Sequence, residues 1–303
     1  SVALGLMADN FFDQPSSKMK VVAVTGTNGK TTVATLLFRL FSSLDYKCGL
    51  ISTVENRICD EVISSTHTTP DAVQLNKLMA EMVSKNCTHC FMEASSHAIH
   101  QNRMMGLNLR GAVFTNLTRD HLDYHKTFDE YIAAKKKLFD FLNEESFALV
   151  NADDKRGAVM VQNTKAKKHF YSLRTVADFT AKILENSFEG LILSIDGSDV
   201  HTQLVGDFNA YNLLAVFATA RLLDVEKSDA LISISNLKPA EGRFDYVISS
   251  KEKITGIVDY AHTPDALEKV LATLKTIRTG NETLFTIVGC GGDRDKGKRP
   301  MMA

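Results

Sequence analysis

The sequence predicts an α/β protein built on a central, mostly parallel sheet. From Lys20 onward, short apolar runs alternate with segments long enough to be helices. The apolar runs carry few polar residues in alternate positions, which is typical of parallel strands covered on both faces. The 303 residues are 44 % hydrophobic and 23 % charged, an ordinary globular composition that argues against disorder. Together these observations place the chain in the α/β class.

Each part of this sheet is predicted from its own segment. The candidate strands of the central sheet are 21–24, 48–54, 90–94, 111–117 and 147–151. Helix-length segments between them are 30–44, 71–85 and 128–142, and a further helix is expected over 210–223. The tract 168–205 has shorter strands and an Asp-Gly turn, which favours a small antiparallel subsheet.

A domain boundary is expected near residue 238. Residues 1–19 are interpreted as the linker remnant of a preceding domain, 20–238 as the central domain, and 239–303 as a partial, Rossmann-like C-terminal domain. The last part is predicted to be strands at 246–250 and 254–260, a helix over 264–277 and another strand at 284–289. With both ends short, we expect this chain alone to catalyse little or no reaction.

Composition excludes several classes of protein. The 35 basic and 36 acidic residues leave a net charge of −1, so no overall field attracts nucleic acid or an anionic membrane. No apolar stretch reaches about 18 residues, so membrane insertion is not expected. The five cysteines favour a reduced, cytoplasmic protein. Cys87 and Cys90 form one C-x-x-C, which we interpret as a buried strand end, with zinc binding or redox chemistry as the lesser alternative.

A glycine-rich loop follows the first strand. The segment T-G-T-N-G-K-T-T, residues 25–32, lies between an apolar strand and a helix. Glycines such as Gly26 and Gly29 let backbone N–H groups surround phosphate oxygens, while Lys30 reaches the terminal phosphates and the Thr31 hydroxyl can ligate Mg²⁺. The strict P-loop pattern fails because its first glycine falls on Val24. The segment therefore predicts a variant nucleotide triphosphate site, and the lack of an N-K-x-D motif favours adenine.

Two other predicted strands end in polar residues. Glu93 stands where the strand 90–94 stops, and Asp120, His121 and Asp123 follow the strand 111–117. In an open α/β sheet, ligands gather at the carboxyl ends of strands, where the glycine-rich loop also lies. A carboxylate and an imidazole at this edge could bind a second Mg²⁺, although a core or capping role for His121 is an equal alternative.

Lys135 falls on the wrong face of its predicted helix. The apolar stripe of 128–142 continues through Lys135, whereas Lys136 and Lys137 point elsewhere. A buried ammonium is costly unless it is paired or deprotonated. The residues leave three readings open: a salt bridge, conversion of the amine by CO₂ into a metal-binding carbamate, or a lysine that snorkels from the edge of the stripe.

Seven motifs in order resemble the Mur ligases. They are T-G-T-N-G-K-T-T, E-A-S-S-H-A-I-H-Q-N-R, D-H-L-D-Y-H with the later A-A-K, G-D-F-N-A-Y-N, E-G-R-F, D-Y-A-H-T-P-D and G-C-G-G-D-R-D-K-G-K-R-P. The resemblance covers residues 15–303, and the last three motifs point to the branch that adds the third amino acid of the muramoyl peptide. It implies ATP- and Mg²⁺-dependent joining of a diamino acid, diaminopimelate or lysine, to UDP-MurNAc-L-Ala-D-Glu through an acyl phosphate, in a cytoplasmic enzyme expected to be a monomer.

The resemblance also implies roles for individual residues. Catalysis falls to Lys30, Glu93, His121 and Lys135, of which Glu93, His121 and a carbamylated Lys135 ligate metal together with Thr31. The nucleotide contacts implied are Gly26, Thr27, Asn28, Gly29, Lys30, Thr31, Thr32, Asn209, Asn212, Arg243 and Asp259. The muramoyl substrate is matched to Thr68, Thr69, Ser95, Gln101 and Arg103, and the carboxylate of the incoming amino acid to Arg294. Two alternatives remain: a folylpolyglutamate synthase-like ligase, and a non-catalytic nucleotide-binding module.

Overall fold

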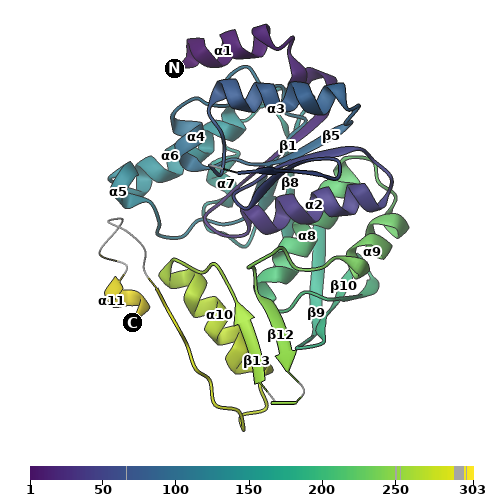
Figure 1. Ribbon diagram of the computed structural model, residues 1–303, viewed down its shortest axis with the longest axis vertical. Helices are drawn as coiled ribbons and strands as arrows, with labels where there is room; N and C mark the ends of the chain where they lie inside the picture. The colour runs from purple at the N-terminus through teal and green to yellow at the C-terminus, as the bar shows by residue number, and fades with distance from the viewer. Residues whose placement is uncertain (66, 250, 253, 290–296, 298) are drawn as a thin grey trace.

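The structure is a computed structural model that describes residues 1–65, 67–249, 251–252, 254–289, 297 and 299–303. Within these ranges, one 11-stranded sheet forms the centre of the molecule (Figure 1). Its strands, in spatial order, are β11 (Ser198–Thr202), β10 (Gly190–Ile195), β9 (Phe179–Ser187), β8 (Lys167–Ser172), β7 (Phe147–Asn151), β6 (Gly111–Phe114), β1 (Lys20–Thr25), β5 (His89–Glu93), β2 (Cys48–Ile51), β3 (Glu55–Ile58) and β4 (Glu61–Ser64).

The middle of this sheet is parallel and both of its edges are antiparallel. All neighbouring strands from β9 to β2 pair in parallel. Strands β9, β10 and β11 form the predicted antiparallel subsheet, which continues the main sheet, and Asp196 and Gly197 both take positive φ in its Asp-Gly turn. The α/β class and the subsheet are therefore confirmed. At the opposite edge, β2 falls within the strand expected at 48–54, whereas the β3–β4 hairpin beyond it was not expected, because its strands are short and joined by Cys59-Asp60 instead of a typical turn pair.

Helices cover both faces of the sheet (Figure 1). Val22 and Val24 of β1 pack towards the helices α2 and α8, while Val21 and Ala23 pack into the apolar layer that contains α3 and α6. This two-sided burial explains the unbroken apolar strands. The described helices are α1 (Val2–Phe11), the 3₁₀ turn η1 (Pro15–Lys18), α2 (Lys30–Ser43), α3 (Ala72–Ser84), α4 (Ser96–His100), α5 (Leu122–His125), α6 (Phe128–Asp140), α7 (Gly157–Met160), α8 (Asp207–Leu222), α9 (Lys227–Asn236), α10 (Pro264–Ile277) and α11 (Arg299–Met302).

Side-chain caps set the starts of several helices. The Asp71 carboxylate accepts from Val73 N and Gln74 N at α3, and the Thr127 hydroxyl accepts from Glu130 N at α6. Thr263 caps α10 in the same way, ahead of Pro264. By contrast, the N-cap residue of α2 is Gly29, which offers no side-chain cap. Its first N–H groups therefore remain available to a bound anion.

The C-terminal part lies below the sheet in Figure 1. Strands β12 (Asp245–Ser249) and β13 (Ile254–Val258) form an antiparallel pair, and α10 matches the predicted bounds 264–277. The strand predicted at 284–289 is wrong: Phe285 is 86 % and Ile287 99 % exposed, and no described strand pairs with the segment. A β-forming sequence becomes a strand only where an edge and a buried face receive it. Residues 1–19, expected to be a linker, include the ordered helix α1, which lies over α3.

His89 at the start of β5 should make the fold sensitive to acid. It is 4 % exposed, its ring lies 4.7 Å from that of Phe41, and burial lowers its pKa to about 4. The unfolded chain, with a histidine pKa of about 6.5, then binds more protons between about pH 6.5 and 4, so stability falls as the pH drops through this window. Between pH 7 and pH 5, the free energy of unfolding of the wild type should therefore fall. We expect this fall to be smaller by about 2 kcal/mol in His89→Phe, measured by urea denaturation at both pH values. The same substitution at the partly exposed His169 serves as control, and an equal loss in both variants would contradict the assignment.

Candidate active site

A cavity of about 850 Å³ opens at the carboxyl ends of the parallel strands, between the central sheet and the C-terminal part. It brings together most of the residues singled out in the sequence. Those lining it are Thr27, Asn28, Gly29, Lys30, Thr31, Thr32, Thr68, Thr69, Glu93, Ser95, Arg103, His121, Lys135, Asn209, Asn212, Arg243 and Asp259. Gly26 and Gln101 do not line it, although each contacts a residue that does. Arg294 lies outside the described residues.

The glycine-rich loop connects β1 to α2 at the floor of this cavity. At Gly26, with φ of 154°, a Cβ would lie 1.9 Å from Thr115 Oγ1, so this position requires glycine. Lys30 Nζ donates to the carbonyl oxygens of Gly26 (3.0 Å) and Thr27 (2.8 Å), curled over its own loop. Burial lowers the pKa of Lys30. The loop thus presents uncapped N–H groups and one amine, which is the donor set that a polyphosphate needs.

Glu93 is a buried carboxylate, and one of its two oxygens has no hydrogen-bond partner among the described residues. It ends β5, is 0 % exposed, and its Oε1 accepts from Thr53 N at 2.7 Å. Its Oε2 is buried and has no hydrogen-bond partner among the described residues. A buried carboxylate oxygen left without a partner is costly. A cation at this point would remove that cost, so Glu93 fits the role of a Mg²⁺ ligand.

Lys135 is buried, as predicted from its helical stripe. It is 1 % exposed, so it does not snorkel, and its Nζ donates to Gly26 O at 2.7 Å and lies 4.7 Å from the centre of the Tyr131 ring. No carboxylate of the described residues lies within 4.0 Å of it, which rules out the salt bridge there. Burial, and next the charge of Lys30, holds the pKa of Lys135 well below its usual range. This amine is therefore disposed to be neutral.

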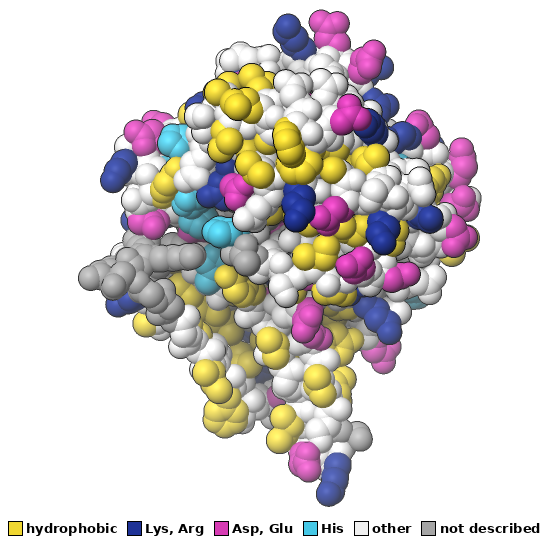
Figure 2. Space-filling model, turned by 45° about the horizontal axis from the view of Figure 1, so that its top comes forward, with side chains coloured by type: hydrophobic (Ala, Val, Ile, Leu, Met, Phe, Trp, Pro, Cys, Tyr) yellow, Lys and Arg dark blue, Asp and Glu magenta, His cyan; other side chains and the backbone are white. Residues whose placement is uncertain are grey.

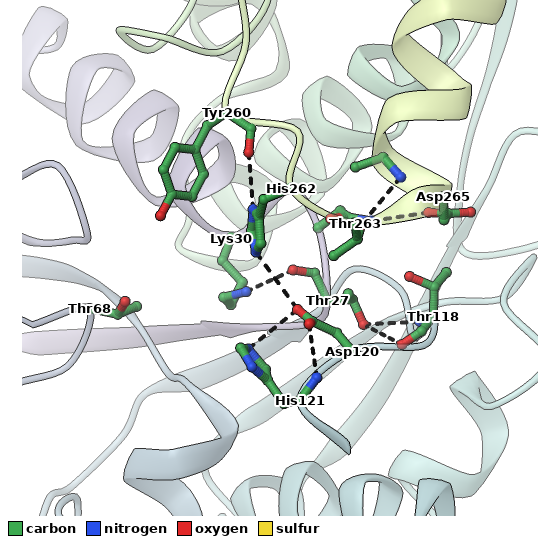
Figure 3. A network of polar contacts seen from close by, with 12 residues as sticks. Thr27, Lys30, Thr68, Thr118, Asp120, His121, Tyr260, His262, Thr263 and Asp265 are labelled. Atoms are coloured by element: carbon green, nitrogen blue, oxygen red, sulfur yellow. Dashed lines mark hydrogen bonds and ion pairs between the residues drawn. The ribbon is translucent and has the colours of Figure 1, made fainter. Parts of the chain in front are cut away.

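Asp120 joins the central and C-terminal parts of the cavity. Its Oδ2 lies 3.3 Å from His121 Nε2 and 3.8 Å from Nε2 of His262, which belongs to the loop before α10 (Figure 3). Burial lowers the pKa of His121 to about 3 in spite of Asp120, so its ring is neutral at pH 7. A neutral imidazole can ligate a metal ion.

These donors do not form a preformed metal cage. Across the part of the chain that the structure describes, no three His, Cys, Asp or Glu side chains converge on one point. Mg²⁺ is commonly held by one or two carboxylates together with substrate phosphates and water. Glu93 and the Thr31 hydroxyl beside the phosphate loop suit this mode, in which the nucleotide supplies the remaining oxygens.

The residues matched to the muramoyl substrate form one connected network on the other side of Glu93. Thr69 Oγ1 donates to Glu93 O at 2.8 Å, and Ser95 N donates to Thr69 Oγ1. Arg103 donates to Thr69 O and, through two nitrogens, to Gln101 Oε1. Thr68 accepts a hydrogen bond from the Thr53 hydroxyl at 3.0 Å. These hydrogen bonds fix the guanidinium of Arg103 and the hydroxyls of Thr68, Thr69 and Ser95 on the cavity wall next to Glu93.

Among the described residues, the C-terminal part contacts the phosphate loop at two points and Asp120 at a third. Arg243 donates to Thr31 Oγ1 at 3.0 Å, and Asn28 Nδ2 donates to Asp265 at 3.1 Å. The third contact is the approach of His262 to Asp120 (Figure 3). Asp259 accepts from the backbone N–H groups of Phe244 and Ala261, and burial raises its pKa. The roof of the cavity is thus positioned by hydrogen bonds to its floor.

The start of α8 closes the far end of the cavity. Asn209 Nδ2 donates to Val205 O at 2.8 Å and Asn212 Nδ2 donates to Asn209 Oδ1 at 3.0 Å, and both side chains are buried. Tyr211, between them, donates to Asp153 at 2.9 Å. Amide and carboxylate groups held in this way can form hydrogen bonds with the polar edge of a planar base.

Sequence reasoning missed several residues that position the site. Thr53 holds both Glu93 and Thr68, and the Tyr131 hydroxyl lies 3.1 Å from Thr27 Oγ1 while its ring faces Lys135. Tyr131 lies on the apolar stripe of 128–142, which indicated no functional role, and nothing in the local sequence marked Thr53. His262 and Asp265 stood in the D-Y-A-H-T-P-D motif, which was the available signal.

His97, His100, His121 and His125 lie close together beside the cavity, and Figure 2 shows histidine side chains (cyan) on the surface near the junction with the C-terminal part. His97 lies 4.9 Å from His121 and 5.6 Å from His125 between ring centres, and His100 lies 5.8 Å from His125. His125 Nε2 is 2.9 Å from Ser96 Oγ. His97 lines the cavity, whereas His100 and His125 pack the α4–α5 corner.

Comparison with known proteins decides the family. Residues 24–220 match the Mur ligase middle domain, and residues 242–303 match the Mur ligase glutamate ligase domain. The chain belongs to the Mur ligase family. Among curated relatives, it is 58 % identical over 301 residues to the UDP-N-acetylmuramoyl-L-alanyl-D-glutamate–2,6-diaminopimelate ligase of Cytophaga hutchinsonii. This alignment covers 99 % of this chain and 62 % of that protein. The chain thus spans about three fifths of the length of the curated relatives it matches.

Solved structures agree with this membership. A structure of a UDP-N-acetylmuramoyl-L-alanyl-D-glutamate–2,6-diaminopimelate ligase aligns with a TM-score of 0.81 and 34 % identity, over 99 % of this Mur ligase chain and 63 % of the other. Folylpolyglutamate synthase from Mycobacterium tuberculosis, complexed with ADP and AMPPCP, aligns with a TM-score of 0.75 over 91 % of this chain and 70 % of that one, at 15 % identity. The second likeness shows a shared fold only. Among the described residues, no helix combines the length and apolarity needed to cross a bilayer.

Proposed function

We propose that this Mur ligase chain carries the nucleotide site and the acid-activating site of a ligase that joins 2,6-diaminopimelate to UDP-MurNAc-L-Ala-D-Glu at the expense of ATP. The observation that carries the proposal is one cavity in which the phosphate loop, the open carboxylate of Glu93 and the amine of Lys135 meet. The names of the relatives that match nearly the whole chain supply the substrates. We further propose that it acts as a cytoplasmic monomer.

The first step is transfer of the γ-phosphoryl group. An oxygen of the D-glutamate carboxylate attacks the γ-phosphorus, ADP leaves, and an acyl phosphate forms. The N–H groups at the start of α2 and Lys30 bind the phosphates, and Lys30 would exchange its bonds to Gly26 O and Thr27 O for phosphate oxygens. Glu93, Thr31 and His121 are the proposed protein ligands of Mg²⁺, which neutralises phosphate charge when bound.

In the second step, the amine of the diamino acid attacks the acyl carbon. The nitrogen loses its proton, a tetrahedral intermediate collapses, and inorganic phosphate leaves. Arg103, held by Gln101 and the carbonyl of Thr69, and the hydroxyls of Thr68 and Ser95 are proposed to hold the muramoyl peptide. Asn209 and Asn212 are proposed to contact adenine, Asp259 the ribose, Arg243 phosphate, and Arg294 the amino acid carboxylate.

We also propose that Lys135 is carboxylated on Nζ. The neutral amine attacks CO₂, a C–N bond forms and one proton is released, which leaves a carbamate. Burial without a carboxylate partner among the described residues favours the neutral amine that this reaction needs. The product is an anion beside Lys30, so it gives the buried ammonium of Lys30 a negative partner and adds an oxygen ligand to the cavity that Glu93 also lines.

The proposed function is tested on the protein at its full natural length. With ATP, Mg²⁺, UDP-MurNAc-L-Ala-D-Glu and meso-diaminopimelate, we expect stoichiometric ADP release and a product of the corresponding mass by mass spectrometry. L-Lysine in place of meso-diaminopimelate should give at most a few per cent of the rate.

Other outcomes would replace the proposal. Preference for L-lysine would overturn the amino acid assignment, and turnover only with a folate and L-glutamate would identify the folylpolyglutamate synthase-like alternative. Tight ATP binding with no ADP release, although both co-substrates are present, would identify a nucleotide-binding module.

A further inference from the structure

The cysteines at the amino ends of β2 and β5 form a cluster remote from the cavity. Cys87 stands two residues before β5, whose opposite end carries Glu93, roughly 20 Å away along an extended strand. Cys59 begins the β3–β4 turn with φ of 53°, and its N–H donates to Cys48 O at 2.9 Å. All four described cysteines, Cys48, Cys59, Cys87 and Cys90, are free thiols. The cluster therefore has no part in the proposed ligase chemistry.

Within this cluster, the close pair is Cys59 with Cys87. Their sulfur atoms lie 3.7 Å apart, although the residues are 28 positions apart in the chain. The C-x-x-C of the sequence is not the pair: Cys90 is 0 % exposed on β5 among apolar side chains, as a buried strand end should be. A metal is not indicated either, because no group of three ligating side chains exists in the described residues.

We propose that Cys59 and Cys87 are a reversible thiol–disulfide site, at which a low-molecular-weight disulfide such as oxidised glutathione links the β3–β4 turn to the start of β5. Closing the bond from 3.7 Å to about 2.05 Å requires each sulfur to move by less than about 1 Å. Side-chain rotation can supply a shift of this size. A turn at the sheet edge can also adjust more easily than a central strand.

The two cysteines differ in access, which sets the order of events. Cys59 is partly exposed, whereas Cys87 is 4 % exposed and burial raises its pKa to about 12. Cys48 and Cys90 are 1 % and 0 % exposed, so neither is open to an external reagent. Cys59 is thus the thiol that meets the oxidant, and Cys87 is the resolving thiol.

The chemistry balances with the small disulfide as the oxidant. The Cys59 thiolate attacks one sulfur of the small disulfide, a mixed disulfide forms, and one small thiol leaves. Cys87 then gives up its proton and attacks Cys59 Sγ, which releases the second small thiol. Two protein S–H bonds become one S–S bond, and the small disulfide is reduced to two thiols. An excess of reduced thiol runs the sequence backwards.

The link should stabilise the protein. It closes a loop that contains α3 and the Thr68–Thr69 segment, and such a cross-link lowers the entropy of the unfolded chain. We expect the Tm to rise by roughly 5 °C on oxidation and to return on reduction with dithiothreitol.

The experiment uses a Cys290→Ser background, so that the four remaining thiols are the described ones. After oxidised glutathione, we expect an intact mass lower by about 2 Da, two titratable thiols after denaturation, and a tryptic fragment joining Cys59 to Cys87. Added Cys87→Ser should stop at a glutathione adduct on Cys59, and added Cys59→Ser should not react. Added Cys90→Ser is the matched control and should still form the link.

Three results would overturn the proposal. They are a glutathione adduct that persists on Cys59 while Cys87 is present, a link from Cys87 to Cys48 or Cys90, and no reaction of the folded protein. The measurement on the background protein decides the matter even if a serine variant fails to fold. Because the readouts are mass, thiols and Tm, they remain valid whatever the outcome for the proposed ligase.

Discussion

Lys30→Met is expected to lower ATP turnover by roughly 10²–10³-fold while leaving the fold intact. In the structure Lys30 Nζ is bonded only to carbonyl oxygens of its own loop among the described residues, so its removal breaks no ion pair there. When the nucleotide is bound, the Lys30 ammonium contacts its phosphates. Its positive charge stabilises the negative charge of these phosphates in the transition state of phosphoryl transfer. Single-turnover phosphate release and thermal melting would measure the two effects.

Lys137→Met provides the control for loss of one positive charge, because Lys137 is exposed on α6. We expect this variant to turn over ATP at the wild-type rate. If Lys30→Met kept more than about a tenth of the wild-type rate at saturating ATP, the phosphate-binding role of Lys30 would be wrong.

Lys135→Met should lower the rate of ligation by a factor similar to that expected for Lys30→Met, without loss of stability. Lys135 is buried with no carboxylate partner among the described residues, so an apolar side chain of similar length removes a desolvation cost and leaves Tm unchanged or higher. If the working form is a carbamate, small carboxylates such as acetate should restore part of the activity of a smaller variant, Lys135→Ala. Wild-type activity should fall in CO₂-free buffer and return with bicarbonate.

Intact mass provides an independent readout. We expect about 44 Da above the sequence mass, for one CO₂ per chain, lost on acidification. Lys136→Met is the control on the same helix, since Lys136 pairs with Asp140 at 2.7 Å and should carry no carboxylate. Full activity of a wild-type protein shown to be free of the modification would contradict the carbamate and leave Lys135 a positioning residue.

The regular part of the fold was predictable because its signals are local. Runs such as 21–24 and 147–151 are apolar without alternation, and both appear as buried parallel strands, β1 and β7. The α10 helix begins at a Thr-Pro pair and matches its expected bounds. In such segments propensity, capping and burial point to the same structure.

The missed and incorrect secondary-structure predictions concern segments whose structure depends on a neighbouring strand. The β3–β4 hairpin is formed by short, partly exposed strands, of which β3 pairs with β2 and β4 forms the edge of the sheet. The segment 284–289 has strand composition but no described partner. Strand formation depends on an available edge, which no window of sequence contains.

For the candidate site, the sequence by itself determined which kinds of groups are present and at which strand ends they stand. The phosphate loop, Glu93, His121 and the inward direction of Lys135 were all predictable, because loop chemistry and helical periodicity are local properties. Only the tertiary structure decided that Thr53 holds Glu93, that Lys135 meets the carbonyl of Gly26, and that Asp120 meets His262. These contacts join residues distant in the chain, and they arise from the packing of whole elements against one sheet.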